Sequence, residues 1–468
     1  MEKCLVSWVY NQVGRSTTIP PDSYINPFNT IIMKNVAIAS LFVASASAFP
    51  WVADQQGVDS SLFGGRRAKR QQPGGNNPGG AATCPFNADH KGAVPFNPAY
   101  PYNNAKNGSQ GNGKGGYQVP APGDTAHAFQ MPTSSDIRGP CPGLNAAANH
   151  GFLSRDGLVT FNELVDAQQN VYNVGYDLAL LLAALGLTTT DGDVVTEKLS
   201  IGCDATTRTS YNPTLTGSEP GLDGHNKFEA DSSLTRDDFF LGDGDNFSFN
   251  GTLFGMMNNS TGGNFGRDEL SKYRQERYNQ SLANNPNFYF GPLSLLLYGA
   301  ASFLYELMPN GNQNYQPNLE TISTFFGAEQ GSDGSWTFTG GERIPDNWTN
   351  RVAPYTNNDV TTEILAMYLE NPVMFGGATS DGGFDALPDF GSIQNGKISP
   401  TISGTNTACL LYQLSTQSVP SYLNGVITPT VDALNFIASK VAPQYENLGC
   451  PIALTKRDEA VAAQAFKA

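Results

Sequence analysis

Apolar residues recur at helical spacing in several stretches of the chain. Between 161 and 185 they fall mostly three or four positions apart, which predicts one long helix that Gly186 ends. The same kind of spacing predicts helices over 289–307, 360–369 and 429–441. Because the alternation typical of strands is sparse, the sequence predicts a mostly α-helical fold, a single domain with long loops.

The N-terminal region is typical of targeting and processing segments rather than of a folded domain. The stretch 33–48 has a basic start, a short apolar run and an Ala-x-Ala cleavage pattern, which predicts a signal peptide. Residues 1–32 precede it and are predicted to be a non-native upstream extension, since a signal peptide normally starts the chain. Residues 49–70 end in a basic run at 66–70, which predicts a cleaved propeptide, with a solvated basic loop as the alternative.

The rest of the chain divides by composition into three parts. Residues 71–125 form an arm rich in glycine, proline and asparagine, 126–455 carry the predicted domain, and 456–468 form a C-terminal tail. With a net charge of -15 over 468 residues, the surface disfavours nucleic acid and anionic membranes as partners. No apolar run after the leader is long enough to span a bilayer, so no membrane insertion is predicted.

Asn-x-Ser/Thr sequons point to an extracellular location and predict a secreted glycoprotein. Four of them crowd between 246 and 259, which predicts one exposed loop there. The predicted glycosylation sites are Asn107, Asn246, Asn250, Asn258, Asn259, Asn279 and Asn347.

Five cysteines follow the predicted leader, so at least one has no disulfide partner within the chain. They are Cys84, Cys141, Cys203, Cys409 and Cys450. Cys141 is the candidate for the unpaired thiol, because metal ligation would occupy its sulfur. Cys84 can pair with Cys203, but their spacing alone does not establish a bond.

Cys141 lies between Pro140 and Pro142, a helix-compatible stretch follows at once, and an Asn-His-Gly sequence lies at 149–151. Each proline fixes φ and lacks an N–H, so the chain enters the helix rigidly. The helix N-terminus places backbone N–H groups near the sulfur, which is expected to lower the thiol pKa and favour the metal-binding thiolate. A free or disulfide-bonded cysteine before an ordinary helix is the alternative.

The run around Cys141 resembles the proximal-ligand segment of the fungal haem-thiolate peroxidases, the chloroperoxidase and unspecific aromatic peroxygenase family. In that family the Cys of a Pro-Cys-Pro turn binds haem iron, so the resemblance implies haem b with Cys141 as its axial ligand. A thiolate ligand donates electron density to the iron and favours O–O cleavage. The resemblance runs from about His127 to about Thr349, and longer family members imply a disulfide between Cys409 and Cys450.

A second match lies in 225–236, which resembles the family's Glu-x-Asp-x-Ser motif. The resemblance implies that the Glu229 carboxylate, the Ala230 carbonyl and the Ser233 hydroxyl bind one divalent cation, Mg²⁺ or Mn²⁺, beside a haem propionate. Such oxygen ligands suit a hard cation, and the cation would neutralise a propionate that is otherwise buried unpaired. A solvated acidic loop is the alternative.

The chain departs from the family in the predicted distal pocket. Relatives carry an acid-base Glu just after a Tyr-Gly pair, and this position is Ala300. An Arg that precedes it in the peroxygenase branch is also missing from 292–295. Glu306 lies on the same predicted helix but on a different face, so we do not expect it to replace the missing carboxylate. No catalytic residue is therefore assigned.

These features together predict a secreted enzyme that uses hydrogen peroxide to oxidise or oxygenate a small organic substrate. Two alternatives stay open: a tailoring enzyme of fungal secondary metabolism with a restricted substrate, and a non-catalytic haem-binding protein. The histidines are too scattered to predict a zinc site. His150 is expected to make a structural hydrogen bond after the Cys141 helix.

Overall fold

A computed structural model describes the following residues, all within one compact unit, Asp59–Ala468: 84–189, 192–216, 218–226, 229–379, 381–387, 393–400, 402, 436, 439 and 440. The predicted signal peptide, propeptide and C-terminal tail, and the Cys409–Cys450 pair, lie outside these residues. Of the helix predicted over 429–441, only Phe436, Ser439 and Lys440 are described, and each is helical.

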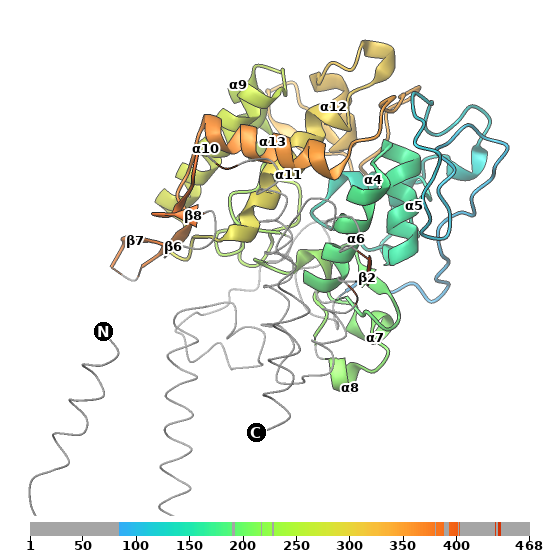
Figure 1. Ribbon diagram of the computed structural model, residues 1–468, viewed down its shortest axis with the longest axis horizontal. Coiled ribbons are helices and arrows are strands. Elements are labelled where there is room, and N and C mark those ends of the chain that lie inside the picture. The colour runs from blue at the N-terminus through green and yellow to red at the C-terminus, as the bar shows by residue number, and fades with distance from the viewer. Residues whose placement is uncertain are drawn as a thin grey trace, which may run out of the picture. The chain divides into compact units, whose positions relative to one another are not determined.

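Helices dominate the described part of the chain, and the strands are short (Figure 1). The α-helices are α4 Pro142–Asn149, α5 Phe161–Tyr172, α6 Tyr176–Thr189, α7 Thr206–Thr209, α8 Pro213–Thr216, α9 Gly251–Thr261, α10 Arg267–Asn284, α11 Leu296–Glu306, α12 Leu319–Phe325 and α13 Asn357–Glu370. The 3₁₀-helices are η2 Thr125–His127, η3 Gly221–Asp223, η4 Pro292–Leu295 and η5 Gly311–Gln313. The predicted helical character is confirmed, with small sheets added to it.

The strands pair antiparallel in separate small sheets. The first strand of the first sheet directly precedes α5 in the chain, and in this sheet Val159 pairs with Leu199. The sheets are β1 Leu158–Thr160 with β2 Lys198–Ser200, β3 Tyr289–Phe290 with β6 Gly376–Ala378 and β7 Phe384–Ala386, β4 Ala328–Gln330 with β5 Trp336–Phe338, and β8 Ile393–Gln394 with β9 Lys397–Ile398.

The single helix predicted over 161–185 is wrong, because the chain breaks into α5 and α6 at Asn173. This residue has φ of 52°, a left-handed conformation that asparagine tolerates at a helix end. Its Nδ2 atom donates to the carbonyls of Arg351 and Val352, at 3.1 and 3.0 Å. Gly186 does not end the second helix either, since α6 continues to Thr189.

Helices α9, α10 and α12 are absent from the sequence-based prediction. Helix α10 has a buried face at helical spacing, but part of that face is arginine, so hydrophobicity alone misses it. Helices α9 and α12 are capped by Asn250 and Asn318, whose side chains accept the backbone N–H of Leu253 and Thr321. An asparagine at the N-cap position is a sequence signal for the start of a helix, so α9 and α12 could have been predicted from it. The helix predicted over 360–369 is confirmed as α13, and the one predicted over 289–307 is confirmed from Pro292 as η4 with α11, whereas Tyr289–Phe290 form strand β3.

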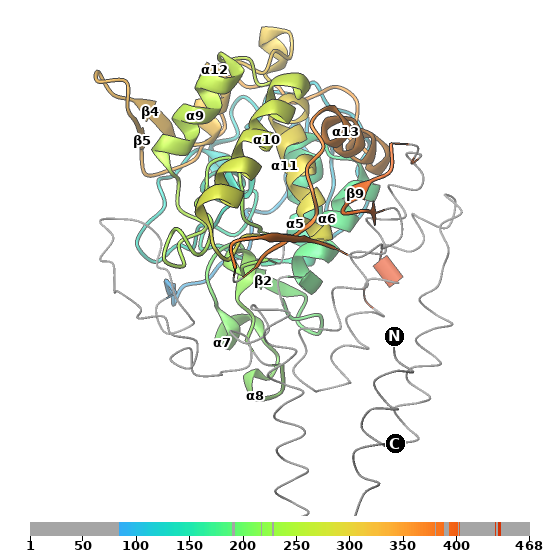
Figure 2. The same cartoon turned by 90° about the vertical axis from the view of Figure 1, so that its left-hand side faces the viewer.

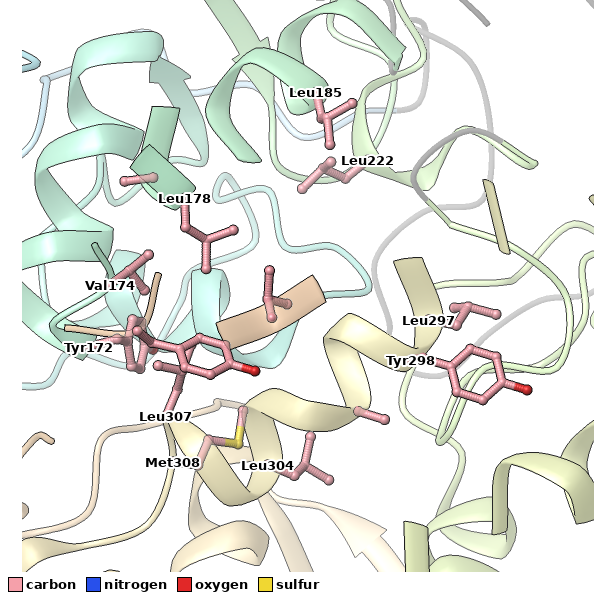
Figure 3. Close-up of a cluster of buried hydrophobic side chains, with 14 of the residues drawn as sticks. Tyr172, Val174, Leu178, Leu185, Leu222, Leu297, Tyr298, Leu304, Leu307 and Met308 are labelled. Carbon is pink, nitrogen blue, oxygen red and sulfur yellow. The ribbon is translucent and has the colours of Figure 1, made fainter. Parts of the chain in front are cut away.

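The core gathers the apolar faces of the central helices. Helix α5 packs on α6, and α11 packs on α10 and α13, as Figures 1 and 2 show. Figure 3 shows Leu304 of α11 and, just after this helix, Leu307 and Met308, with Leu307 on the side of Tyr172 at the end of α5. Among the described helices, none combines the length and the apolar character needed to cross a membrane.

Candidate functional site

The turn that carries Cys141 is fixed by local bonds and by close backbone packing. Cys141 is the N-cap of α4, and Pro142 stands at its first helical position, as predicted. The Asn145 side chain accepts from the Gly139 N–H at 3.1 Å and donates to the Gly139 carbonyl at 2.8 Å. A Cβ atom on Gly139 would lie 1.8 Å from the carbonyl oxygen of Ile201, so only glycine fits here.

A buried carboxylate from far along the chain anchors the same helix. Glu342 Oε1 accepts from Asn145 Nδ2 at 3.0 Å, and its backbone carbonyl accepts from Asn149 Nδ2 at 2.8 Å. Arg236 Nη2 lies 3.6 Å from the same Oε1 atom, and both side chains are buried. The side-chain amides of Asn145 and Asn149 therefore hold α4 against the segment around Glu342, and Arg236 supplies positive charge beside the Glu342 carboxylate.

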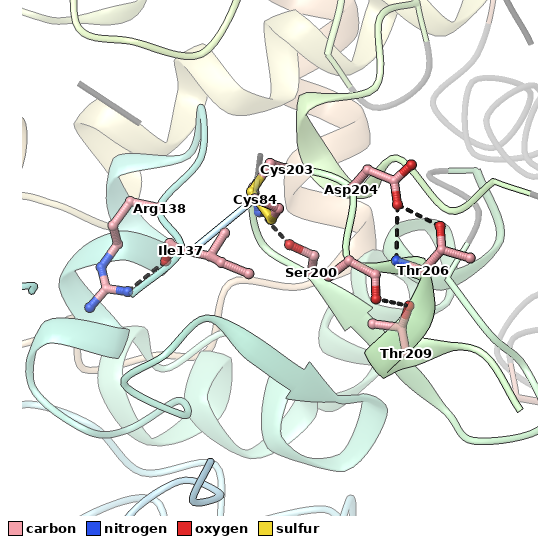
Figure 4. Close-up of a disulfide and its surroundings, with 10 residues drawn as sticks. Cys84, Ile137, Arg138, Ser200, Cys203, Asp204, Thr206 and Thr209 are labelled. Carbon is pink, nitrogen blue, oxygen red and sulfur yellow. Dashed lines mark hydrogen bonds between the residues drawn. A yellow bond between two sulfur atoms is a disulfide. The ribbon is translucent and has the colours of Figure 1, made fainter. Parts of the chain in front are cut away.

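A disulfide joins Cys84 to Cys203 beside this turn (Figure 4). Its two sulfurs share a small buried cluster with Ile137, which precedes the Pro-Cys-Pro run. The sequence left this pairing open, and the structure supplies it. Among the residues that the structure describes, Cys141 is the free cysteine, in agreement with the cysteine count.

Cys141 opens into a cavity of about 230 Å³ with mostly apolar walls. One wall is a face of α11, where the lining residues recur three or four positions apart. The lining side chains from α11 are Leu296, Leu297, Ala300, Phe303 and Leu304, and Leu307 and Met308 follow the helix. The polar and charged lining includes Gln168, Glu229, Ser233, Thr235, Arg236 and Arg274.

Burial raises the pKa of the Cys141 thiol. Hydrogen bonds from the backbone N–H groups of Leu144 and Gly143 oppose that effect, as does the charge of Arg236. The expectation of a lowered thiol pKa is therefore wrong for the protein chain itself, because desolvation outweighs the helix N-terminus. A metal ion at the sulfur reverses this balance, since a coordinating thiol is deprotonated outright.

Two of the predicted cation ligands, Glu229 and Ser233, line the same cavity. Glu229 is buried, and its Oε2 atom accepts from Asn246 Nδ2 at 2.6 Å and lies 3.1 Å from His225 Nδ1. The other carboxylate oxygen, Oε1, is buried without a hydrogen-bond partner. The Ser233 hydroxyl donates to the Ala230 carbonyl at 3.2 Å.

This donor set fits a hard cation. An unpartnered buried carboxylate oxygen is costly unless a positive group meets it, and a carboxylate, a carbonyl and a hydroxyl are oxygen donors of the kind that Mg²⁺ accepts. Within the described ranges, no three His, Cys, Asp or Glu side chains converge on one point as a metal site. The set at Glu229 has one such side chain, so the cation at Glu229, Ala230 and Ser233 stays a prediction.

Two buried arginines also line the cavity, and neither was predicted from the sequence. Arg236 Nη1 donates to Thr235 Oγ1 at 3.1 Å, and Arg274 Nη2 donates to Ser232 Oγ at 3.2 Å. The Nε atom of each is buried without a hydrogen-bond partner. Burial lowers the pKa of both guanidiniums, to about 10 for Arg274, so Arg274 stays charged at neutral pH.

The residues present fit haem. A free thiol faces an apolar cavity, and three buried polar atoms at its border lack partners: Glu229 Oε1, Arg236 Nε and Arg274 Nε. An apolar ring system with charged substituents at its edge matches such a lining. Polar atoms of this kind are otherwise expensive to bury.

The position of the missing acid-base group is now clear. Ala300 lines the cavity and is exposed to its space, so no side chain fills the volume in front of it. Glu306 is not among the lining residues, and its carboxylate accepts from Arg351 Nη1 at 2.7 Å. This geometry agrees with the expectation that Glu306 does not replace the missing carboxylate.

The predicted exposed loop of glycosylation sites is wrong. Asn250 caps α9, and Asn258 and Asn259 lie within that helix. Asn246 is buried, and its Nδ2 atom, where a glycan would be attached, donates to Glu229 Oε2 and to the Asp223 carbonyl. The fold therefore leaves no room for a glycan on Asn246.

The other sequons differ in exposure. Asn250 and Asn258 are half-buried, and their glycosylation stays a prediction. The exposed sequon residues are Asn107, Asn259, Asn279 and Asn347.

His150 makes the expected structural hydrogen bonds. Its Nδ1 atom lies 2.9 Å from the His127 carbonyl oxygen, and its Nε2 atom accepts from the Ile344 N–H at 3.2 Å. Both ring nitrogens are satisfied within the protein, so the ring ties the end of α4 to two other segments.

Comparison with known proteins identifies the family. The sequence profile described as "Peroxidase, family 2" matches residues 127–353. An aromatic peroxygenase of Coprinellus radians is 36% identical over 229 residues, which cover 47% of this chain and 85% of the relative. The dothistromin biosynthesis peroxidase dotB of Dothistroma septosporum is 30% identical over 341 residues, 69% of this chain and 81% of the relative. The aromatic peroxidase fscJ of Fusarium equiseti is 27% identical over 347 residues, 69% of this chain and 78% of the relative.

The chain belongs to this peroxidase family, the fungal haem-thiolate family of the chloroperoxidases, and is a peroxide-using oxidoreductase. The matched range begins at His127, where the sequence-based resemblance also begins, so that recognition is confirmed. The family implies haem, peroxide and an organic substrate.

Proposed function

We propose that this protein is a secreted peroxidase or peroxygenase that uses hydrogen peroxide to oxidise or oxygenate a small apolar substrate. The observation that carries the proposal is the free Cys141 thiol at the N-terminus of α4, facing a cavity with apolar walls. The predicted signal sequence at 33–48 and the exposed sequons support secretion.

In this proposal the protein binds haem b, and three groups of residues act on it or on its substrate. Cys141 would hold the haem iron through its thiolate, and the two hydrogen bonds between Asn145 and Gly139 keep the turn that carries the sulfur in place. Glu229, Ala230 and Ser233 hold Mg²⁺ or Mn²⁺ at the cavity edge. Haem bound through a thiolate supplies peroxide activation, because the ligand favours O–O cleavage. The apolar side chains of α11 bind the substrate and exclude water.

A tailoring enzyme with a restricted substrate is the second candidate. The observation that favours it is Ala300, which leaves the α11 wall without a carboxylate facing the cavity. One relative is named as a biosynthesis peroxidase, and another as an aromatic peroxidase. In such an enzyme the substrate itself supplies the proton transfer that Ala300 lacks. Family membership favours both enzymes over a non-catalytic haem-binding protein.

Spectroscopy and turnover together test the proposal. We expect the purified protein to contain haem, to show a strongly red-shifted Soret band as the ferrous carbon monoxide adduct, and to oxidise a simple phenol with peroxide. An intact thiolate spectrum without phenol turnover would exclude a general peroxidase and leave the tailoring enzyme and the non-catalytic haem-binding protein. A histidine-type spectrum would contradict both candidates.

Glu229→Gln is expected to weaken cation and haem retention together. An amide oxygen is neutral and binds a hard cation less well, and even second-shell changes cost about 10–100-fold in metal affinity. We expect the bound cation, measured by elemental analysis beside the haem absorbance, to fall at least about tenfold.

The matched control for this change is Asp231→Asn. Asp231 belongs to the same loop, but its oxygens accept from Asn285 Nδ2 at 3.1 Å and from the Phe239 N–H at 3.2 Å, and it does not line the cavity. We expect this variant to keep its cation. Wild-type protein without stoichiometric Mg²⁺, Mn²⁺ or Ca²⁺ would rule the site out.

A further inference from the structure

Three arginines are buried around the loop 229–236, and they differ in their acidic partners. Arg277 Nη2 lies 3.2 Å from Asp238 Oδ1, and Arg236 Nη2 lies 3.6 Å from Glu342 Oε1. Arg274 is 1% exposed, and no carboxylate of the described residues lies within ion-pair distance of it. A buried cation without a counterion is strongly destabilising, and within the described residues Arg274 has no carboxylate in direct contact.

Part of the Arg274 guanidinium is already used to hold the acidic loop. Its Nη1 donates to the Ser232 carbonyl, and its Nη2 donates to Ser232 Oγ at 3.2 Å. The Tyr298 ring lies below it, with the guanidinium carbon 5.4 Å from the ring centroid. The Nε–H has no acceptor in the described chain, and Arg274 lines the cavity that Cys141 faces.

We propose that Arg274 is the binding residue for one carboxylate of haem, which supplies the counterion that its buried guanidinium lacks. The inference rests on the proposed function, since it takes haem as the occupant of the cavity. It adds a second anchoring point to the predicted cation site. The cation meets one carboxylate through Glu229 and Ser233, and Arg274 meets a carboxylate directly, as a guanidinium does well.

The charges that line the cavity support an occupant with an anionic group at Arg274. The lining carries two guanidiniums, Arg236 and Arg274, against the single carboxylate of Glu229. Arg236 has Glu342 beside it, so the uncompensated charge is that of Arg274. A fully apolar occupant would leave this charge buried and unpaired, whereas a ring system with carboxylates at its edge pairs it.

Haem and its dimethyl ester separate this role from a structural one. The ester keeps the ring and the iron but carries no carboxylate charge. Holoenzyme is prepared with haem or, after extraction, with the ester, and release of each to excess apomyoglobin is followed by absorbance. We expect Arg274→Met to speed haem release about tenfold or more, the scale of one charge-assisted hydrogen bond, and to leave ester release nearly unchanged.

Two further variants keep the test independent of folding. Arg277→Met is the matched control: Arg277 lies on the same helix and donates to the Ser233 carbonyl at 2.8 Å, but it does not line the cavity. We expect it to change haem and ester release by the same factor. Arg274→Lys keeps the charge and is expected to retain part of the preference for haem over its ester.

The outcomes distinguish this inference from the proposed function. Equal acceleration of haem and ester release in Arg274→Met would show that Arg274 only holds the loop, and no acceleration would show that it contributes nothing. Either result overturns the inference and leaves the proposed function intact. A wild-type protein that binds the ester but shows no preference for haem overturns it too. A wild-type protein that binds neither overturns both.

Discussion

Cys141→Ala is expected to abolish the red-shifted Soret band of the ferrous carbon monoxide adduct and to reduce peroxide-dependent turnover at least about 100-fold. The reason is that outer-shell partners of a metal ligand alone typically contribute about 10–100-fold, so removal of the ligand itself exceeds that range. The variant has a methyl group in place of the Cys141 CH2–SH group, and among the described residues Cys141 is the free cysteine that lines the cavity. Absorbance spectra and phenol oxidation measure both effects.

The control for this variant changes the same turn without removing the sulfur. The Tyr172 hydroxyl donates to the Gly143 carbonyl at 2.7 Å, and its ring lines the cavity. Tyr172→Phe removes that bond and leaves Cys141 in place, so we expect the thiolate spectrum to persist. Full haem retention with an unchanged band in Cys141→Ala would overturn the assignment of Cys141 as the ligand.

The Cys141 turn could be predicted because its information is local. Pro142 at the first helical position and the residue before it as the N-cap follow from the chemistry of neighbouring residues. The direction of the thiol pKa could not be predicted in the same way. It depends on how deeply the sulfur is buried by segments far along the chain, and burial raises the pKa despite the helix N-terminus.

The supports of the site depend on distant contacts that spacing does not encode. Glu342 and Asn145 are hydrogen-bonded although they lie 197 positions apart in the sequence, and the Cys84–Cys203 disulfide spans 119 positions. Arg274 lies on α10, whose buried face is partly charged, so no apolar pattern marked it. The break at Asn173 has the same origin, because its left-handed conformation is held by carbonyls of Arg351 and Val352.

Ala300→Glu is expected to raise the rate of reaction with hydrogen peroxide at least about tenfold. The family resemblance implies, at this position in relatives, a carboxylate that takes a proton from peroxide and returns it to the leaving oxygen. A positioned acid-base group contributes typically about 10²–10⁴-fold, which is roughly 3–5 kcal/mol of barrier. A methyl group cannot transfer a proton. Ala300 faces the open space of the cavity, so a longer side chain enters without displacing the α11 wall.

The introduced carboxyl also predicts a pH dependence. Leu296, Phe303 and Leu304 flank Ala300 on the cavity wall, and such apolar surroundings raise the pKa of a carboxyl by desolvation. Only the deprotonated form accepts the first proton from peroxide. The advantage of Ala300→Glu over wild type should therefore be small at acidic pH and grow as pH rises through that raised pKa. Stopped-flow absorbance across pH measures it.

Ala300→Gln separates proton transfer from simple filling of the cavity. Glutamine has nearly the same size as glutamate, but its amide does not accept and return a proton as a carboxylate does. We therefore expect Ala300→Gln to react with peroxide no faster than wild type. A gain shared by both variants would mean that positioning or solvation of peroxide is the cause. A wild-type rate equal to that of Ala300→Glu at every pH would mean that another group already moves the proton. The assignment of Ala300 as the position of a missing acid-base group would then be wrong.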